Sequence, residues 1–237
     1  MTGSVVSWYS GGITSAIATL RAIERWGDVR IVFFETGSHH PDNERFFADC
    51  ERLFQRPIES IQHRGFNDVF DLFVKEKFIN SPYGARCTLL MKKRMRQDWE
   101  KENDFTHQVF GFESDSREIS RAQRFLRDYP YTNAVFPLIE EGTTKENCIS
   151  ELESYGIELP AMYRLGYSNN NCVGCVKGGM GYWNKIRIDF PEVFDRMAQV
   201  ERIVGASAIN GVYLDELDPM RGRMSKPLVQ SCGIFCE

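Results

Sequence analysis

The first third of the chain alternates between short apolar segments and amphipathic segments, and this alternation limits the folds open to it. Strands are expected at residues 5–8, 30–34, 58–62 and 109–112. Helices are expected at residues 15–26, 42–54, 67–77 and 89–101. Strands that alternate with helices form parallel sheets covered by helices on both faces, so we predict an α/β fold with a doubly wound, mostly parallel sheet.

The pattern changes after residue 136. Residues 144–155 begin with a Thr and continue with Glu and Leu, which predicts a capped helix. A Gly- and Asn-rich irregular region then reaches Gly181, and a further helix is expected over 191–204. The last thirty residues are loop-rich and end close to two cysteines.

The chain has no internal repeat, low-complexity tract or Pro/Ser-rich linker, so we predict a single domain over residues 1–237. Within it we expect an α/β core over residues 1–140. A helical, cysteine-rich C-terminal extension is expected over residues 141–237.

Composition excludes several classes of protein. No apolar run approaches the roughly 20 residues of a membrane span, and the first residues lack a secretory signal, so we expect a soluble, cytoplasmic protein without a membrane partner. A net charge of -4 argues against broad electrostatic wrapping of nucleic acid. The local basic cluster KKRMR, from Lys92 to Arg96, has two interpretations: a solvated helix face or an anion site.

The loop SGGITS joins the first expected strand to the first expected helix. At the carboxyl end of a strand in an open α/β sheet, backbone N–H groups and the helix dipole attract an anion. Glycines let the backbone approach that anion, and hydroxyls add hydrogen bonds. The candidate anion-binding residues are Ser10, Gly11, Gly12, Thr14 and Ser15.

Two further segments strengthen this interpretation. The second expected strand ends in FETG, which places the Glu35 carboxylate at the same edge of the sheet. The segment GFESDSREISRA contains Arg117 and Arg121, four residues apart and therefore on one face of a helix. Arginine pairs bind sulfate or phosphate bidentately, although an exposed, ion-paired helix is the alternative.

Five of the seven cysteines lie outside helical apolar stripes, namely Cys87, Cys172, Cys175, Cys232 and Cys236. The C-x-x-C in NNNCVGCVKGG suits a loop that curls two thiolates around a metal, or a dithiol redox pair. Five thiols are enough for a four-ligand site with one left over. Zinc and an iron–sulfur cluster both suit such ligands, and the spacing does not separate them.

Other candidates have simpler interpretations. Cys50 and Cys148 fall within helical patterns and are expected in the core. His39 and His40, in GSHHP, are expected to line a loop at the rim of a pocket.

Together these segments resemble the phosphoadenosine phosphosulfate (PAPS) reductase family, within the superfamily of adenine nucleotide α-hydrolases with a PP-loop. The resemblance covers nearly the whole chain: SGGITS, FETG, RCTLLMKK, GFESDSREISRA, FPL at 136–138, LPAMYRLGYSNNNCVGC and the tail. Residues 159–175 are its most specific part, because they combine aromatic, turn and ligand residues in a fixed order. The chain is also similar to the compact, often phage-encoded branch of this family.

The resemblance implies a Rossmann-like fold and a role for each matching residue. The loop that holds the phosphate or sulfate end of the nucleotide is matched by Ser10, Gly11, Gly12, Thr14 and Ser15. The strand end that lines the adenosine pocket is matched by Glu35, Thr36 and Gly37. The residues that close over the nucleotide are matched by Gly111, Arg117 and Arg121, and a lysine downstream of the first cluster cysteine by Lys92. Three ligands of a [4Fe–4S] cluster are matched by Cys87, Cys172 and Cys175.

The sequence departs from the family at several places, among them Glu35, where the family more often has Asp before Thr-Gly. Thr88 follows Cys87 where one branch has a second adjacent cysteine, so Cys236, or alternatively Cys232, is expected to supply the fourth ligand. The tail SCGIF keeps the Cys of the reductases' mobile motif but not its flanking Glu and His, and Cys232 is the candidate nucleophile. Thr14 stands where ATP-cleaving relatives have an Asp, which favours a sulfated nucleotide over ATP.

The resemblance implies an enzyme of sulfur metabolism. The first hypothesis is a sulfonucleotide reductase, in which Cys232 attacks the sulfate of PAPS or adenylyl sulfate (APS) and a thioredoxin-like partner releases sulfite. The second is an ATP-dependent sulfurtransferase that thiolates a nucleic acid or another acceptor. The third is a non-catalytic nucleotide- or cluster-binding module. A homodimer is compatible with each.

Overall fold

The computed structural model describes residues 4–81 and 84–223, and these form two compact units. The first unit contains residues 4–34, 41–61 and 97–160, and the second contains residues 35–40, 62–81, 84–96 and 161–223. The units are therefore interleaved along the chain. Their boundaries differ from the expected division into a core and a C-terminal extension at residue 140. The single-domain organisation stays a prediction.

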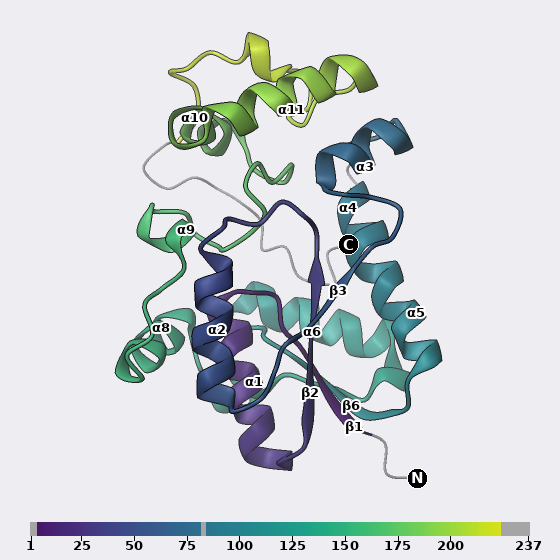
Figure 1. Cartoon of the computed structure of the whole chain (residues 1–237), viewed down its shortest axis with the longest axis vertical. Coiled ribbons are helices and arrows are strands. Elements are labelled where there is room, and N and C mark those ends of the chain that lie inside the picture. Colours follow the sequence, from purple (N-terminus) through teal and green to yellow (C-terminus); the bar gives the residue numbers. More distant parts are fainter. Residues whose placement is uncertain (1–3, 82–83, 224–237) are drawn as a thin grey trace. The chain divides into compact units, whose positions relative to one another are not determined.

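The main sheet has five strands in the order β3-β2-β1-β6-β7. Strand β1 pairs in parallel with both β2 and β6, and β6 pairs in parallel with β7. The strands are β1 (Ser4–Trp8), β2 (Val29–Glu35), β3 (Glu59–Gln62), β6 (Phe105–Phe110) and β7 (Ala134–Val135), and a small antiparallel hairpin contains β4 (Asn80–Ser81) and β5 (Gly84–Ala85). This mostly parallel sheet flanked by helices confirms the predicted α/β class (Figure 1).

The helices alternate with these strands as expected. The α-helices are α1 (Ile13–Trp26), α2 (Asn43–Phe54), α3 (Val69–Glu76), α4 (Arg86–Thr88), α5 (Met95–Glu102), α6 (Ser116–Asp128), α7 (Pro137–Glu141), α8 (Lys145–Ser154), α9 (Ala161–Arg164), α10 (Met180–Asp189) and α11 (Pro191–Val204). The other helical segments are the π-helix η1 (Leu89–Arg94) and the 3₁₀ helices η2 (Pro130–Thr132) and η3 (Leu214–Glu216). The expected capped helix is α8, in which Thr144 and Asn147 form a capping box.

Helix α10 was not predicted, and its environment explains why. Most of its residues between Gly181 and Ile186 are buried, including Tyr182, Trp183 and Asn184. A helix that is covered on several sides has no polar stripe, so it lacks the periodic pattern by which amphipathic helices are recognised. The Gly-rich residues before it reinforced the interpretation as a loop.

The core of the first unit lies between α1 and the sheet. Helix α1 contacts β1 and β6, and the side chains of Val6, Ile13 and Ile17 are fully buried. Arg21 on the outer side of α1 forms a bidentate ion pair with Glu151 of α8. Apolar burial and this ion pair together fix α1, the helix that follows the glycine loop.

The core of the second unit is formed by α3, α10 and α11. Helices α10 and α11 pack side by side, and α11 also contacts α3 (Figure 1). The cluster includes Phe73, Trp183 and Met197, and it extends to the buried Cys172 and Cys175. The C-x-x-C loop is therefore anchored in a hydrophobic core.

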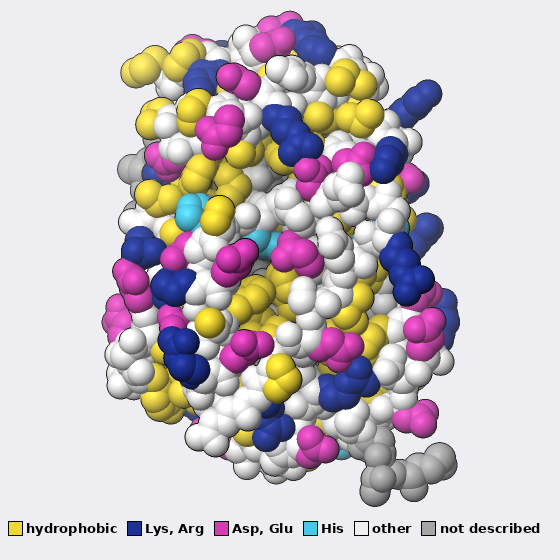
Figure 2. All heavy atoms as spheres, in the orientation of Figure 1, with side chains coloured by type: hydrophobic (Ala, Val, Ile, Leu, Met, Phe, Trp, Pro, Cys, Tyr) yellow, Lys and Arg dark blue, Asp and Glu magenta, His cyan; other side chains and the backbone are white. Residues whose placement is uncertain are grey.

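Charged side chains of both signs are interspersed over the face shown in Figure 2. This agrees with the modest net charge of -4. Among the described residues, no helix is long and apolar enough to cross a membrane.

Candidate functional site

The SGGITS loop lies at the topological switch point of the sheet. It follows β1, whose neighbours are β2 on one side and β6 on the other, so the chain continues from the centre of the sheet in two directions. In open α/β sheets, ligands bind outside the carboxyl ends of the strands at this point. The loop and the start of α1 are therefore placed where an anion-binding site is expected.

Local hydrogen bonds hold the loop. The Ser10 N–H and hydroxyl both donate to Ser15 Oγ, at 3.1 and 3.0 Å, and the Ser15 hydroxyl donates to the Gly12 carbonyl at 2.8 Å. Gly11 has a φ of 78°, a conformation that favours glycine. Gly12 caps α1 without a side-chain hydrogen bond, and the first turn, which includes Thr14, contains no acidic residue. The positive end of this helix is thus not neutralised by a carboxylate of its own first turn.

A second glycine comes from the neighbouring strand. Gly111 follows β6, and a Cβ atom placed on it would lie 2.5 Å from Ser15 Cα. No side chain fits at that distance, so the loop after β6 packs directly on the first turn of α1. The structure thereby brings the predicted residues Gly111 and Ser15 together.

The two predicted arginines lie in α6 but have different surroundings. Arg117 is exposed, and its backbone N–H donates to the N-cap residue Asp115. Arg121 donates to both carboxylate oxygens of Glu118 and lies over the ring of Phe112, 4.6 Å from its centroid. Glu118 and Phe112 therefore orient the Arg121 guanidinium, and its buried Nη2 makes no hydrogen bond within the described part of the chain.

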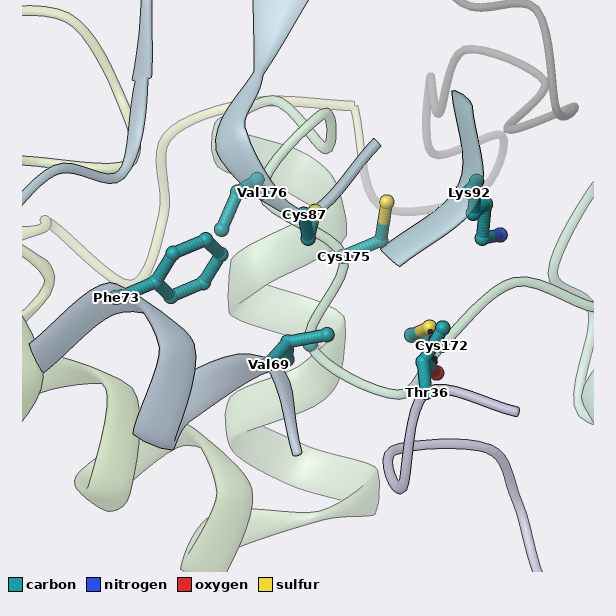
Figure 3. Close-up of a pocket in the computed structure, with 9 residues that line it drawn as sticks. Thr36, Val69, Phe73, Cys87, Lys92, Cys172, Cys175 and Val176 are labelled. Carbon is teal, nitrogen blue, oxygen red and sulfur yellow. Dashed lines mark hydrogen bonds between the residues drawn. The ribbon is translucent and has the colours of Figure 1, made fainter. Parts of the chain in front are cut away.

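In the second unit, three of the predicted cysteine ligands line one cavity. Cys87, Cys172 and Cys175 surround it together with Thr36, Lys92 and several apolar side chains (Figure 3). The cavity has a volume of about 20 Å³, which is about the space of one water molecule. The described cysteines are all thiols rather than disulfides.

Soft thiolates are the ligands that zinc and iron–sulfur clusters prefer, so this donor set fits a thiolate-bound metal in kind. Among the described residues, no three Cys, His, Asp or Glu side chains are arranged as ligands of one metal ion. Cys232 and Cys236, the predicted nucleophile and fourth ligand, lie outside the described residues.

Cys172 has polar neighbours from the segment after β2. Its Sγ lies 3.0 Å from Thr36 Oγ1 and 3.9 Å from His39 Nε2. The other ring nitrogen of His39, Nδ1, lies 2.9 Å from Glu35 Oε1, which also accepts the Gly37 N–H at 2.6 Å. Thr36 and Glu35, predicted as part of the adenosine pocket, are thus in the same hydrogen-bonded group as a cysteine.

This group shifts the pKa values of its charged members. Burial opposes a charged imidazole, but the Cys172 thiolate and the Glu35 carboxylate outweigh it and raise the pKa of His39 to about 9. Burial also opposes ionisation of Glu35, yet hydrogen bonds and charge from His39 lower the pKa of this carboxyl to about 2. Sequence reasoning assigned His39 only to a pocket rim. The position of His39 four residues after Glu35 was the sequence feature that could have indicated their contact.

The basic cluster KKRMR is divided by the fold. Lys92 and Arg96 are buried, and Lys92 lines the cysteine cavity, whereas Arg94 is exposed. The interpretation of the cluster as a solvated helix face is therefore wrong for Lys92 and Arg96. The expected helix over 89–101 begins as the π-helix η1, a geometry that is rare and frequent at functional sites.

Cys50 and Cys148 are core residues, as expected. Both are fully buried in helices, and burial raises the pKa of each thiol to about 12. A thiol with such a pKa is protonated at neutral pH, which makes it a poor nucleophile and a poor metal ligand.

Comparison with solved structures places this architecture among known folds. The chain is similar to phosphoadenylyl-sulfate (PAPS) reductase from Candida auris in a phosphate complex, with 14% identity, a TM-score of 0.52, and coverage of 73% of this chain and 82% of that chain. It is also similar to the U34-tRNA thiolase NcsA from Methanococcus maripaludis with its [4Fe-4S] cluster, with 10% identity, a TM-score of 0.45, and coverage of 95% and 83%. No family model and no curated protein matches the sequence. The likeness to the reductase confirms, at the level of the fold, the resemblance expected from the motifs.

Proposed function

We propose that this chain is a PAPS reductase-like enzyme that binds an adenine nucleotide carrying sulfate and transfers its sulfonate group to a thiol. The observation that carries the proposal is the Ser- and Gly-rich loop at the switch point, packed against Gly111 with no acid in the following helical turn. Such a loop binds the anionic end of a nucleotide through backbone N–H groups and hydroxyls. The reductase fold found by structural comparison supports this assignment.

The loop residues Ser10, Gly11, Gly12, Thr14 and Ser15 hold the phosphate or sulfate in this proposal. Arg121 adds a charge-assisted hydrogen bond, because Glu118 and Phe112 already orient its guanidinium. The exposed Arg117 closes over the nucleotide from the start of α6. Glu35, Thr36 and Gly37 line the adenosine side, as the motif resemblance implies. Thr14 in place of an Asp disfavours metal-assisted cleavage of ATP.

The proposed reaction begins at a cysteine of the tail. The Cys232 thiolate attacks the sulfur of the sulfate group, an S–S bond forms, and the S–O bond to the nucleotide breaks with its electron pair on the departing phosphate oxygen. A dithiol protein of thioredoxin type then attacks Cys232 Sγ and displaces sulfite. Its second thiol closes a disulfide and restores the Cys232 thiolate. The dithiol loses two electrons, and the sulfonate sulfur gains them.

The cysteine centre has a separate part in the proposal. Cys87, Cys172 and Cys175 hold a [4Fe–4S] cluster, with Cys236 as the fourth ligand and Cys232 as its alternative; zinc is the competing occupant. When bound, a cluster supplies charge and redox chemistry. Lys92 lines the same cavity.

An ATP-dependent sulfurtransferase is the second candidate. The observation in its favour is Thr88, which is buried next to Cys87 where one branch of the reductases has a second cysteine. In that reaction, ATP activates an acceptor such as a nucleic acid, pyrophosphate leaves, and sulfur replaces the activated oxygen.

Product analysis separates the candidates. Anaerobically purified protein is incubated with APS, PAPS or ATP, with and without thioredoxin, and sulfite and pyrophosphate are measured. We expect sulfite from a sulfated nucleotide and its loss in Cys232→Ser. Pyrophosphate from ATP without sulfite from either sulfated nucleotide supports the sulfurtransferase instead. Nucleotide binding with neither product supports a non-catalytic module.

Metal analysis tests the cofactor independently. Iron, inorganic sulfide and zinc are determined in the same preparation, together with visible absorbance. Brown protein with iron and sulfide supports the cluster, whereas colourless protein with zinc shows that the cluster assignment is wrong.

A further inference from the structure

Two polar side chains from a distant segment lie close to the sulfur of Cys172. Thr36 Oγ1 and His39 Nε2 lie 3.0 and 3.9 Å from Sγ, on a segment more than a hundred residues earlier in the chain. Both distances are within hydrogen-bonding range for a sulfur acceptor. Sequence resemblance assigned this segment to the adenosine pocket, so a role toward the cysteine centre is additional.

We propose that Thr36 and His39 are positioning residues of the cysteine centre, which donate hydrogen bonds to Cys172 Sγ, and that Glu35 orients His39 for this role. The inference rests on the proposed function in one respect, namely that the three thiols bind an iron–sulfur cluster. It deepens that function by naming the groups that control one ligand.

The direction of the hydrogen bonds follows from the chemistry of the partners. An ionised carboxylate only accepts, so His39 Nδ1 carries a proton toward Glu35. A metal-bound thiolate also only accepts, so the Thr36 hydroxyl and the Nε2–H of His39 are the donors toward Cys172. A ring between a carboxylate and a thiolate is placed to donate on both sides. Histidines beside metal centres are commonly oriented by a carboxylate in this way.

Hydrogen bonds fix the C-x-x-C loop against the segment that contains Thr36 and His39. The Val173 N–H donates to the Ser38 carbonyl at 2.8 Å, which joins the C-x-x-C loop directly to the segment of Thr36 and His39. The Ser38 hydroxyl accepts the N–H of Val69, at the start of α3, at 3.2 Å. On the other side of the loop, the Cys175 N–H donates to Tyr182 Oη at 2.8 Å, and the Tyr182 hydroxyl donates to the Cys172 carbonyl at 3.3 Å.

These contacts lie between buried residues of one compact unit. Thr36 and Cys172 are 1% and 8% exposed, and Tyr182 is 1% exposed. Polar groups in such surroundings are costly to leave unpaired, so the arrangement around Cys172 Sγ is maintained by the same forces that maintain the core. The proximity of Thr36 and His39 to the sulfur is therefore a feature of the packed fold.

Hydrogen bonds to a cluster sulfur have two measurable consequences. They stabilise the more negative, reduced form and so raise the reduction potential. They also hold the ligand in its binding orientation, and loss of such outer contacts weakens metal retention roughly 10- to 100-fold. A purely structural role for Thr36 and His39 predicts a change in stability without a change in potential.

The test uses the full chain loaded with its cluster and five proteins: wild type, Thr36→Val, Thr36→Ser, His39→Leu and His40→Leu. Thr36→Val removes the hydroxyl with little change in shape, and Thr36→Ser restores it. His40→Leu is the matched control, since His40 packs against Phe190. Iron and sulfide content, the midpoint potential and the rate of iron loss to a chelator are measured, with circular dichroism as a check of folding.

We expect Thr36→Val and His39→Leu to shift the midpoint potential to more negative values and to lose iron about tenfold faster. Thr36→Ser and His40→Leu are expected to behave as wild type. If Thr36→Val loads fully and keeps the wild-type potential and rate of iron loss, the inference is overturned while the proposed cluster stands. If wild type contains no iron and sulfide, the cluster and the inference are both wrong, whereas the proposed nucleotide chemistry is judged by its own assay.

Discussion

Gly111 has no room for a side chain, because the position of its missing Cβ is 2.5 Å from Ser15 Cα. We predict that Gly111→Ala pushes the loop after β6 away from the first turn of α1. The substitution should lower the free energy of unfolding by about 1–3 kcal/mol, as overpacking does, and weaken binding of APS or PAPS. Urea unfolding and calorimetric titration measure the two effects.

The control for this prediction is Gly179→Ala. Gly179 has a negative φ, and a Cβ atom placed on it meets nothing within 4 Å. Gly179→Ala should therefore leave the affinity for APS or PAPS unchanged, and it should cost at most about 1 kcal/mol of unfolding free energy because Ala is a poorer N-cap than Gly. Equal nucleotide affinity in wild type and Gly111→Ala would show that the close packing at Ser15 does not shape the binding loop.

The buried thiols Cys50 and Cys148 make a prediction about alkaline pH. Burial raises the pKa of each from about 9 to about 12, so the folded state keeps the thiol protonated where the unfolded state ionises. Their contribution to stability is complete below pH 9 and is lost as the pH rises toward 12.

Between pH 8 and pH 10, wild type should therefore lose about 1 kcal/mol more unfolding free energy than Cys50→Ala does. Urea unfolding of both proteins at the two pH values measures this difference. The other titrating groups are the same in both proteins, so their contributions cancel in the difference between the two pH profiles. Parallel pH profiles would show that the Cys50 thiol has an ordinary pKa in the folded protein.

At the scale of secondary structure elements, α6 presents arginines in two different environments. Arg121 is stacked on Phe112 and bound to Glu118, whereas Arg124 is exposed on the same helix. We predict that Arg121→Lys lowers the affinity for APS or PAPS about 10-fold or more, because a charge-assisted hydrogen bond contributes about 1.5–3 kcal/mol and lysine lacks the planar guanidinium.

Arg124→Lys is the matched control and should bind these nucleotides as wild type does. Both affinities are measured by calorimetric titration at fixed ionic strength. Similar losses in the two variants would indicate that α6 attracts the nucleotide through its overall charge rather than through the orientation of Arg121.

At the scale of the whole molecule, the two compact units contain different parts of the proposed machinery. The anion-binding loop belongs to the first unit, and the described cysteine ligands belong to the second. Removal of the metal should therefore speed amide hydrogen exchange mainly in residues 62–81, 84–96 and 161–223, whereas nucleotide should slow it in residues 10–16. Hydrogen exchange with mass spectrometry measures both responses.

The matched control for metal removal is Cys87→Ser, which lacks one ligand and should show the fast exchange without a chelator. If metal removal speeds exchange only in the first unit, the assignment of the metal to these cysteines is contradicted. A nucleotide response confined to the second unit would likewise contradict the proposed role of the SGGITS loop.

Local pattern was sufficient for the central elements of the fold. The alternation of apolar strands and amphipathic helices predicted β1, β2, α1, α2 and α11 within one or two residues. Strands β1 and β2 are short apolar runs that are buried almost throughout, and the buried side chains of α2 and α11 recur at the helical period. Their order also predicted a mostly parallel sheet, and with it the position of the SGGITS loop at a strand end. Helix α10, buried on several sides, has no such period.

The surroundings of side chains depended on contacts between distant parts of the chain. The KKRMR sequence has uniform charge, yet packing buries Lys92 and Arg96 and exposes Arg94. The motifs FETG and CVGC are each recognisable, but their sequences do not encode that Thr36 and His39 face Cys172. Periodicity reports which face of an element is buried. The tertiary structure decides what that face meets, because packing and hydrogen bonding join residues that are remote in sequence.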